Sequence, residues 1–244
     1  MADLSDFDQT VKAISGSEVA YLTVGLAYDF RVWRELWPKI MQNAIEACRR
    51  NQIKLVFFDN VYMYGKVDGW MTESMPYNPY SEKGKVRKQI AGMLMEADER
   101  GKIDASIARS ADFYGPDCNN SGVNLLIVDK LLAGKKPQLM LSADTLHSLT
   151  YVEDAVRGTS LIGRSTDSWN QIWHLPTDRN ALSGRQLIEL ASGYLNQKAS
   201  FTILTSLQLK LIGVFVRQVK ELVEMSYQNE FDYLFDSSKL EKAF

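Results

Sequence analysis

Residues 54–65 read KLVFFDNVYMYG, and this stretch decides the fold class. Four large apolar residues follow one another at positions 55–58, without the alternation of a strand that has one face in water. Such a run is typical of a strand buried on both faces of a parallel sheet. The run stops at Asp59 and Asn60, and open parallel sheets bind ligands just beyond the carboxyl ends of their strands. The stretch therefore predicts a central parallel strand that ends at a functional site.

The segments on both sides of this strand repeat the pattern. Apolar runs at 18–24 and 103–108 predict two further strands, and apolar spacings of three and four predict long helices at 32–51 and 83–100. The order strand, helix, strand, helix, strand indicates βαβ units with a parallel sheet. Pro38 lies inside the first long helix and predicts a kink or a restart there.

The rest of the chain carries shorter and less regular elements. They are helices at 8–14, 124–132, 183–194, 207–227 and 237–244, strands at 138–142 and 172–175, and a segment at 150–161 that starts extended and turns helical. Ser183 is expected to cap the helix that follows it. Because no linker rich in Pro, Gly or Ser occurs, we expect any second lobe to consist of insertions and a C-terminal extension of the same core.

The composition excludes several classes of function. The chain has 244 residues, of which 28 are basic and 30 acidic, so its net charge is −2. A hydrophobic content of 45% excludes a disordered chain, and the missing basic excess argues against nucleic-acid binding. Two distant cysteines and two histidines predict neither a disulfide framework nor a metal site. The sequence shows no signal peptide and no membrane-spanning run, so we expect a cytoplasmic protein without a membrane partner.

Several motifs occur in an order that is known from one family. A strand leads to Tyr-Gly at 64–65, a second strand passes Arg109 and leads to Tyr-Gly-Pro at 114–116, and YVEDA follows at 151–155. The chain ends in DSSKLEKAF at 236–244. In this order the motifs resemble the extended short-chain dehydrogenases/reductases of the NAD-dependent epimerase/dehydratase family. Each motif is short, but their shared order covers essentially the whole chain.

The resemblance implies a fold and a chemistry. The fold would be α/β, a Rossmann-like parallel sheet that is incomplete at its N-terminus, with a smaller C-terminal α/β lobe for the substrate. The core would comprise residues 1–115 and about 145–180, and the lobe residues about 116–144 and 181–244. The activity would be that of an atypical NAD(P)-dependent oxidoreductase acting on a small molecule such as a sugar derivative. The alternative is a catalytically inactive ligand-binding or regulatory protein on the same scaffold.

One departure from the family concerns the cofactor. The glycine-rich turn GxxGxxG, which cradles the pyrophosphate of NAD or NADP in the family, does not occur in this sequence. Asp3 and Leu4 resemble instead a family segment beside the adenine, which usually lies well inside the chain. A fragment of a longer protein and a genuinely short protein both fit this pattern, and it leaves dinucleotide binding by this chain alone in question. Family members often pair through the helix at 32–51, so a homodimer is a further expectation.

A second departure concerns the catalytic residues. The family uses Tyr-x-x-x-Lys on a helix, where the lysine lowers the tyrosine pKa, and these two positions fall on Lys83 and Arg87. The family's Ser or Thr falls on Asn60, whose amide can hydrogen-bond a substrate oxygen but cannot relay a proton. Tyr80 stands near the start of this helix and is a substitute acid, although Gly84 takes the place of its lysine.

Three interpretations of Lys83 and Arg87 are open. Two cations one helical turn apart repel each other, which lowers the lysine pKa and can supply a neutral amine as a base. Together with Lys85, the same residues can instead hold a phosphate or a carboxylate. The third interpretation is a basic helix face in contact with solvent.

The resemblance also assigns residues to the cofactor and to the substrate. Those implied for the cofactor are Asp3, Leu4, Val24, Gly25, Leu26 and Arg109. Those implied for the substrate are Asp112 and His147. A neutral histidine binds a diphosphate less well than a bidentate arginine, and an aspartate repels phosphate, so this pair weighs against a nucleotide diphosphate sugar. The alternatives are structural: a carboxylate partner for Arg109 and a packing role for His147.

Overall fold

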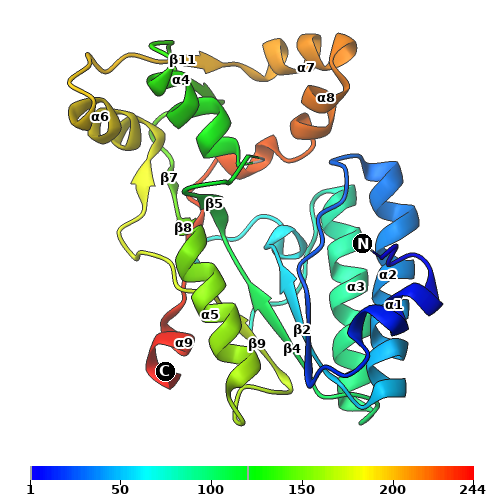
Figure 1. Ribbon diagram of the computed structural model, residues 1–244. Helices are drawn as coiled ribbons and strands as arrows, with labels where there is room; N and C mark the ends of the chain where they lie inside the picture. Colours follow the sequence, from blue (N-terminus) through cyan, green and yellow to red (C-terminus); the bar gives the residue numbers. More distant parts are fainter. Residues whose placement is uncertain (1, 120) are drawn as a thin grey trace.

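Four parallel strands form the central sheet of the computed structural model, which describes residues 2–119 and 121–244 (Figure 1). In spatial order they are β1 (Val19–Leu22), β2 (Lys54–Asp59), β4 (Ala105–Arg109) and β9 (Gln171–His174). All three neighbouring pairs are parallel, so the four strands end at the same edge of the sheet. The α/β fold with a parallel sheet that the sequence predicts is confirmed.

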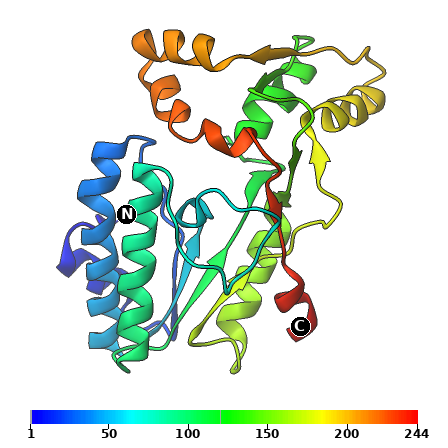
Figure 2. The ribbon, with the colours of Figure 1, turned by 180° about the vertical axis from the view of Figure 1, so that it is seen from behind.

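Helices cover both faces of this sheet. α2 (Phe30–Asn51) and α3 (Glu82–Glu99) lie side by side on one face, as Figure 2 shows, and α1 (Phe7–Ile14) packs against α2. α5 (Val152–Arg164) covers the other face, and α9 (Ser238–Ala243) lies beside β9. Alternate residues of β2 point to the two layers. Leu55 and Phe57 join the core beneath α2 and α3, while Val56 packs with α5.

α2 continues through Pro38 without a break. The predicted restart is therefore wrong, although a proline removes one backbone hydrogen bond from the helix. The reason is burial, because Trp33, Trp37 and Met41 belong to the main core cluster on both sides of the proline. Packing of an apolar helix face supplies most of a helix's stability and outweighs the local preference of one residue.

The remaining elements build a smaller lobe above the carboxyl edge of the sheet (Figure 1). Its helices are the π-helical turn η2 (Asn124–Val128), α4 (Asp129–Leu132), α6 (Gly184–Tyr194), α7 (Ser206–Phe215), α8 (Arg217–Val223) and the 3-10 turn η3 (Ser226–Asn229). Its strands pair in twos: β5 (Asp112–Tyr114) with β8 (Leu149–Tyr151), β6 (Gln138–Met140) with β11 (Thr202–Leu204), and β7 (Leu146–His147) with β10 (Leu182–Ser183). As predicted, Ser183 caps α6, in a reciprocal capping box with Gln186.

Two short elements lie between the core and the lobe. The turn η1 (Tyr62–Tyr64) follows β2, and β3 (Trp70–Met71) pairs with β12 (Leu234–Phe235) from the end of the chain. The last residues of the chain thus return to the region that follows the central strand.

The helix predicted at 207–227 is divided into three pieces. α7 ends at Phe215, Val216 is extended, and α8 then turns toward the sheet (Figure 1). The close approach of α7 and α8 depends on Gly213, because a β-carbon at this position would lie 3.1 Å from the Lys220 Cα atom. None of the described helices is both long and apolar enough to cross a membrane.

Candidate functional site

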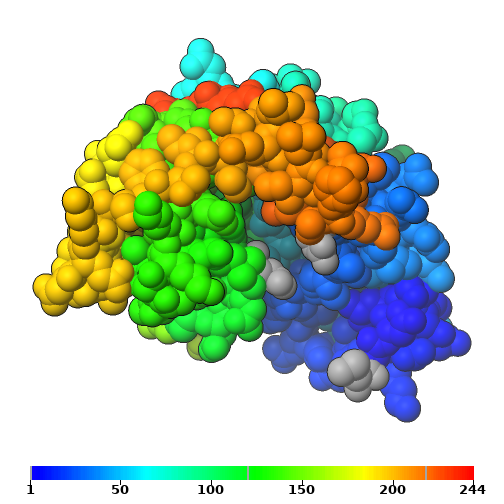
Figure 3. All heavy atoms as spheres, turned by 90° about the horizontal axis from the view of Figure 1, so that it is seen from above, coloured from blue at the N-terminus to red at the C-terminus, as the bar shows by residue number. Residues whose placement is uncertain are grey.

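The carboxyl ends of the strands meet the lobe at a hollow in the surface. Figure 3 looks down on this hollow, between blue residues from the N-terminal part of the chain and the green residues of the lobe. The loop 23–27 follows β1, Asn60 follows β2, and Asp112 follows β4. The parallel topology therefore gathers these three segments at one edge of the sheet.

A buried ion-pair network forms the floor of the site. Asp59, at the end of β2, accepts hydrogen bonds from Arg87 Nε at 2.8 Å and from Arg109 Nη2 at 3.1 Å. Arg109 lies opposite Asp59 in the register of the sheet. All three side chains are buried, so one carboxylate faces two guanidinium groups away from water. Such a network is sensitive to change, because removal of one partner leaves an uncompensated buried charge.

A chain of hydrogen bonds leads from this floor to the last strand. Arg109 Nη1 donates to the Tyr64 hydroxyl at 2.7 Å, and this hydroxyl lies 2.8 Å from His174 Nε2. His174 Nδ1 lies 2.8 Å from the backbone oxygen of Asp236, which can only accept. We therefore assign the ring proton to Nδ1, with Tyr64 donating to Nε2. Burial, and then the charge of Arg109, lower the pKa of His174 to about 3, so the ring is neutral at pH 7.

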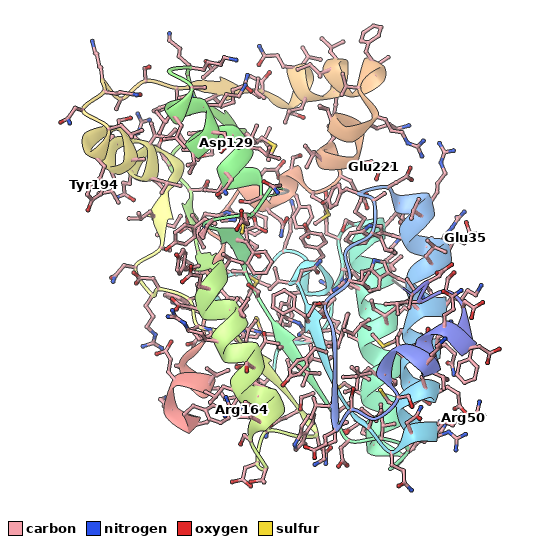
Figure 4. The ribbon with its side chains drawn as sticks, viewed as in Figure 1. Glu35, Arg50, Asp129, Arg164, Tyr194 and Glu221 are labelled. Atoms are coloured by element: carbon pink, nitrogen blue, oxygen red, sulfur yellow. The ribbon has the colours of Figure 1, made fainter. Side chains whose placement is uncertain are left out.

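Lys83 joins α3 to the lobe. Its ammonium group pairs with Glu221 and, at 3.0 Å, with Glu224. Backbone groups extend the contact, because the Lys83 amide donates to Glu224 and the Phe30 amide to Glu221, each at 3.0 Å. Figure 4 shows Glu221 above the upper ends of α2 and α3. These are helix N-termini, where unpaired amides favour negative charge.

The structure separates the two cations that the sequence places one turn apart. Lys83 is fully buried against the lobe, and Arg87, which is 4% exposed, is bound to Asp59 in the floor. A helix face in contact with solvent is therefore wrong for these two residues, and fits only Lys85, whose side chain is 60% exposed. The neutral lysine base and the anion site remain predictions. In either one, a ligand would compete with carboxylates of the chain itself.

Asn60 and Tyr80 occupy different surroundings. The Asn60 side chain accepts a hydrogen bond from the Tyr62 amide at 3.1 Å and shapes the turn after β2. Tyr80 is 61% exposed, and its ring lies 4.9 Å from that of Tyr227. Within the described residues, no hydrogen bond joins Tyr80 to Asn60 or to Lys83. The four residues implied as catalytic thus form no connected acid–base set.

Tyrosines and one acid–histidine pair form the wall beneath the lobe. The hydroxyl groups of Tyr28 and Tyr62 are 3.4 Å apart. Asp112 Oδ2 lies 2.9 Å from His147 Nε2, and the His147 ring stacks on Tyr233 with 4.2 Å between the ring centres. The structure thus brings together the two residues implied for the substrate and stacks Tyr233 on one of them.

Several residues of this site escaped the sequence analysis. Glu221 and Glu224 stand three positions apart in a predicted helix, and this spacing, which places both on one face, was the available signal. Tyr62 did not escape it, because the sequence offers a formal Tyr-x-x-x-Lys at 62–66; Gly65 interrupts this motif just after a strand, so its two side chains need not share a helical face. Tyr28 and Tyr233 carry no comparable signal, since only the folded chain brings their loops to Asp112.

The residues implied for a dinucleotide are divided between three places. The Leu4 oxygen accepts a hydrogen bond from Asn43 of α2, which fixes the segment of Asp3 and Leu4. Val24 and Leu26 pack against the main core, and Gly25 between them borders open space. Arg109 lies in the floor and is bound to other side chains of the chain, as described above.

These residues do not fit a whole dinucleotide. Open space beside Gly25 suits a neutral part of a ligand. A diphosphate needs positive charge, and three buried cations lie near the strand ends. All three are already paired with carboxylates, so none offers a free charge to a diphosphate; they are Lys83, Arg87 and Arg109.

The geometry defines a class of protein, namely a Rossmann-type α/β scaffold that carries a lobe over the carboxyl edge of its sheet. Residues 5–174 match the NAD dependent epimerase/dehydratase family, and the chain belongs to this family. No curated protein sequence matches the chain.

Solved structures share the fold at low sequence identity. A UDP-glucuronic acid 4-epimerase from Bacillus cereus, in complex with UDP-glucuronic acid and NAD, matches with a TM-score of 0.80 at 16% identity, covering 98% of this chain and 73% of that one. A double mutant of a dTDP-glucose 4,6-dehydratase from Streptomyces venezuelae, with NAD bound, matches with a TM-score of 0.75 at 18% identity, covering 98% of this chain and 71% of that one. At such identities the likeness concerns the fold, and the function has to be argued from this chain's own residues.

Lys83→Met is expected to loosen α8 from the sheet. Without the ammonium group, Glu221 and Glu224 repel each other and lose their common partner, so the segment opens more often. Trypsin should then cleave after Lys210, Arg217 or Lys220 roughly three to ten times faster than in the wild type. Lys85→Met is the matched control, because among the described residues Lys85 pairs only with Glu82 of its own helix. Equal cleavage rates in the two variants would show that Lys83 does not hold the lobe.

Proposed function

We propose that this chain is a ligand-binding protein on the epimerase/dehydratase scaffold, without hydride-transfer activity of its own. The observation that carries the proposal is the pairing of Lys83 with Glu221 and Glu224. A catalytic lysine of this family pattern stands one turn from a tyrosine and lowers its pKa. Here the two positions hold Lys83 and Arg87, and carboxylates neutralise both.

The pKa of Tyr62 also supports a binding function without proton transfer. Burial, and then the nearby Asp112 carboxylate, raise the pKa of Tyr62 to about 12. A tyrosine that exchanges a proton near neutral pH needs the opposite shift. The hydroxyl therefore stays protonated and suits hydrogen bonding to a bound molecule rather than proton transfer.

Binding itself is supported by the composition of the wall. Small-molecule sites combine aromatic and apolar surface with a few placed polar groups. The hydroxyl groups of Tyr28 and Tyr62, the Asp112 carboxylate and the His147 ring supply this combination at the carboxyl edge of the sheet.

A second candidate is an NAD(P)-dependent oxidoreductase that acts on a small molecule such as a sugar derivative, with NAD or NADP as its cofactor. Family membership suggests it, and the Asp112–His147 pair favours it, because a histidine beside a carboxylate can hold and move a proton. A homodimer through α2 and a cytoplasmic location stay predictions that are compatible with either candidate.

The two candidates differ in what happens to the nicotinamide. We would screen small sugars, amines and carboxylic acids against the purified chain by NMR, following the indole N–H of Trp33, which donates to the Ala27 oxygen beside the site. Nicotinamide absorbance would be followed in the same mixtures with NADH and NADPH. We expect saturable shifts without a change of absorbance. Turnover of the nicotinamide would favour the oxidoreductase, and the absence of saturable binding would overturn the ligand-binding proposal.

A further inference from the structure

Asp112 differs from the other carboxylates of the site in its partner. Asp59 is bound to two arginines, and Glu221 and Glu224 are bound to Lys83. Asp112 receives a hydrogen bond at Oδ2 from His147, and no lysine or arginine pairs with it within the described part of the chain. Its side chain is 43% exposed, so the second carboxylate oxygen is available to a molecule in the hollow.

Tyrosine side chains from separate loops contribute to the same part of the site as this carboxylate. Tyr28 and Tyr62 face each other through their hydroxyl groups, and Tyr233 lies under the His147 ring. Burial, and then the charge of Asp112, raise the pKa of Tyr233 well above its ordinary value. The same carboxylate contributes to the raised pKa of Tyr28, Tyr62 and Tyr227.

Two of these buried phenol groups, those of Tyr227 and Tyr233, lack a hydrogen-bond partner among the described residues, and Tyr233 is the one that contacts the Asp112–His147 pair. Tyr233 is 3% exposed, and its hydroxyl has no hydrogen-bond partner among the described residues. Buried polar groups are nearly always hydrogen-bonded in folded proteins. An unpaired buried group loses its hydrogen bonds to water and gains none in return, which costs free energy. A hydrogen-bonding group from outside the protein chain is therefore expected next to Tyr233.

The aromatic rings around the site already attract cations. Lys83 Nζ lies 4.7 Å from the centre of the Tyr28 ring, and the Arg87 guanidinium lies 5.7 Å from that of Trp33. The negative face of an aromatic ring stabilises a cation, and more so where water is excluded. Asp112 adds a full negative charge to the same surroundings, which repels anionic groups.

We propose that the hollow binds a small organic cation, with its ammonium group held by Asp112 among the rings of Tyr28, Tyr62 and Tyr233. The inference rests on the ligand-binding function proposed above and names the class of ligand. The ammonium group donates to the free oxygen of Asp112 and to phenol oxygens, which accept while remaining protonated. A phosphate or a carboxylate at this place would meet Asp112 without a countercharge.

Three probes that share one ring test the charge preference directly. They are benzylamine, benzyl alcohol and benzoate, titrated into the 244-residue chain while the Trp33 indole N–H signal is followed by NMR. We expect benzylamine to bind roughly tenfold more tightly than benzyl alcohol, and benzoate to bind least. Benzoate binding as tightly as benzylamine, or no binding of benzylamine, would overturn the inference.

The variant Asp112→Asn isolates the carboxylate. It keeps the shape of the side chain, so we expect benzylamine to fall to the affinity of benzyl alcohol while the alcohol is unaffected. Asp117→Asn is the matched control, since Asp117 lines a separate hollow with Val152 and Arg157 and asparagine tolerates its left-handed backbone. A benzylamine preference that survives Asp112→Asn would also overturn the inference. Probes that bind at this site without any charge preference would leave the ligand-binding function in place and remove only the proposed ligand class.

Discussion

Asp59→Asn is expected to lower the free energy of unfolding by about 3–5 kcal/mol. Asp59 is fully buried and is the carboxylate shared by Arg87 and Arg109, at 2.8 and 3.1 Å. The asparagine keeps the shape but removes the charge, so two guanidinium groups would remain buried beside each other with no anion between them. Urea denaturation at pH 7 measures the change, which is a large part of the stability of an ordinary domain.

Two comparisons separate this charge effect from a general loss of packing. Asp104→Asn breaks the exposed pair of Lys54 and Asp104, and we expect it to cost less than about 1 kcal/mol. Adding Arg87→Met to Asp59→Asn removes one of the two unpaired charges and should recover part of the loss. A double variant that is no more stable than Asp59→Asn alone would refute the uncompensated charge as the cause.

The sequence predicts the fold well because the deciding signals are local. The apolar run at 55–58 and most of the run at 103–108 are buried between the two helix layers, and this single physical fact produces both the sequence pattern and the parallel sheet. The run at 18–24 forms the edge strand β1 instead, where Tyr21 is exposed and Leu22 is buried. The polar residues directly beyond the runs at 55–58 and 103–108, Asp59 and Arg109, lie at the carboxyl edge for the same reason. The local preference of proline gave a wrong prediction at Pro38. The helix continues there because one whole face of it is buried in the core.

The candidate site is less predictable because its partners are distant in the chain. Lys83 meets Glu221 and Glu224, which stand 138 and 141 residues further on, and Tyr64 meets His174 across 110 residues. The sequence shows a basic helix start but not the acidic segment that folds back over it. Lys83 therefore resembles an accessible cation in the sequence, although the structure buries it completely. Residues that are neighbours in the sequence determine helix and strand. The charge state of a site depends instead on contacts between distant residues, which only the topology creates.

His174 is expected to make the fold sensitive to acid. Its pKa is lowered from the ordinary 6.5 to about 3 by burial and by Arg109, so the folded protein keeps the ring neutral where the unfolded chain binds a proton. The stabilising contribution is therefore complete above pH 6.5 and is lost as the pH falls from 6.5 toward 3. Within this window the unfolding free energy should fall by about 1.4 kcal/mol per pH unit, or about 5 kcal/mol in total.

His174→Gln tests this assignment, because glutamine has a donor and an acceptor but does not titrate. The variant loses the stacking of His174 on Phe235, at 4.1 Å between ring centres, and should be less stable than the wild type at pH 7. Its unfolding free energy should nevertheless depend less steeply on pH between 6.5 and 4, so the two curves converge on acidification. His147→Gln is the matched control, since the His147 side chain reaches solvent and lies outside the buried chain of hydrogen bonds. If urea denaturation gave His174→Gln the same pH slope as the wild type, the buried neutral ring would not be the source of the acid sensitivity.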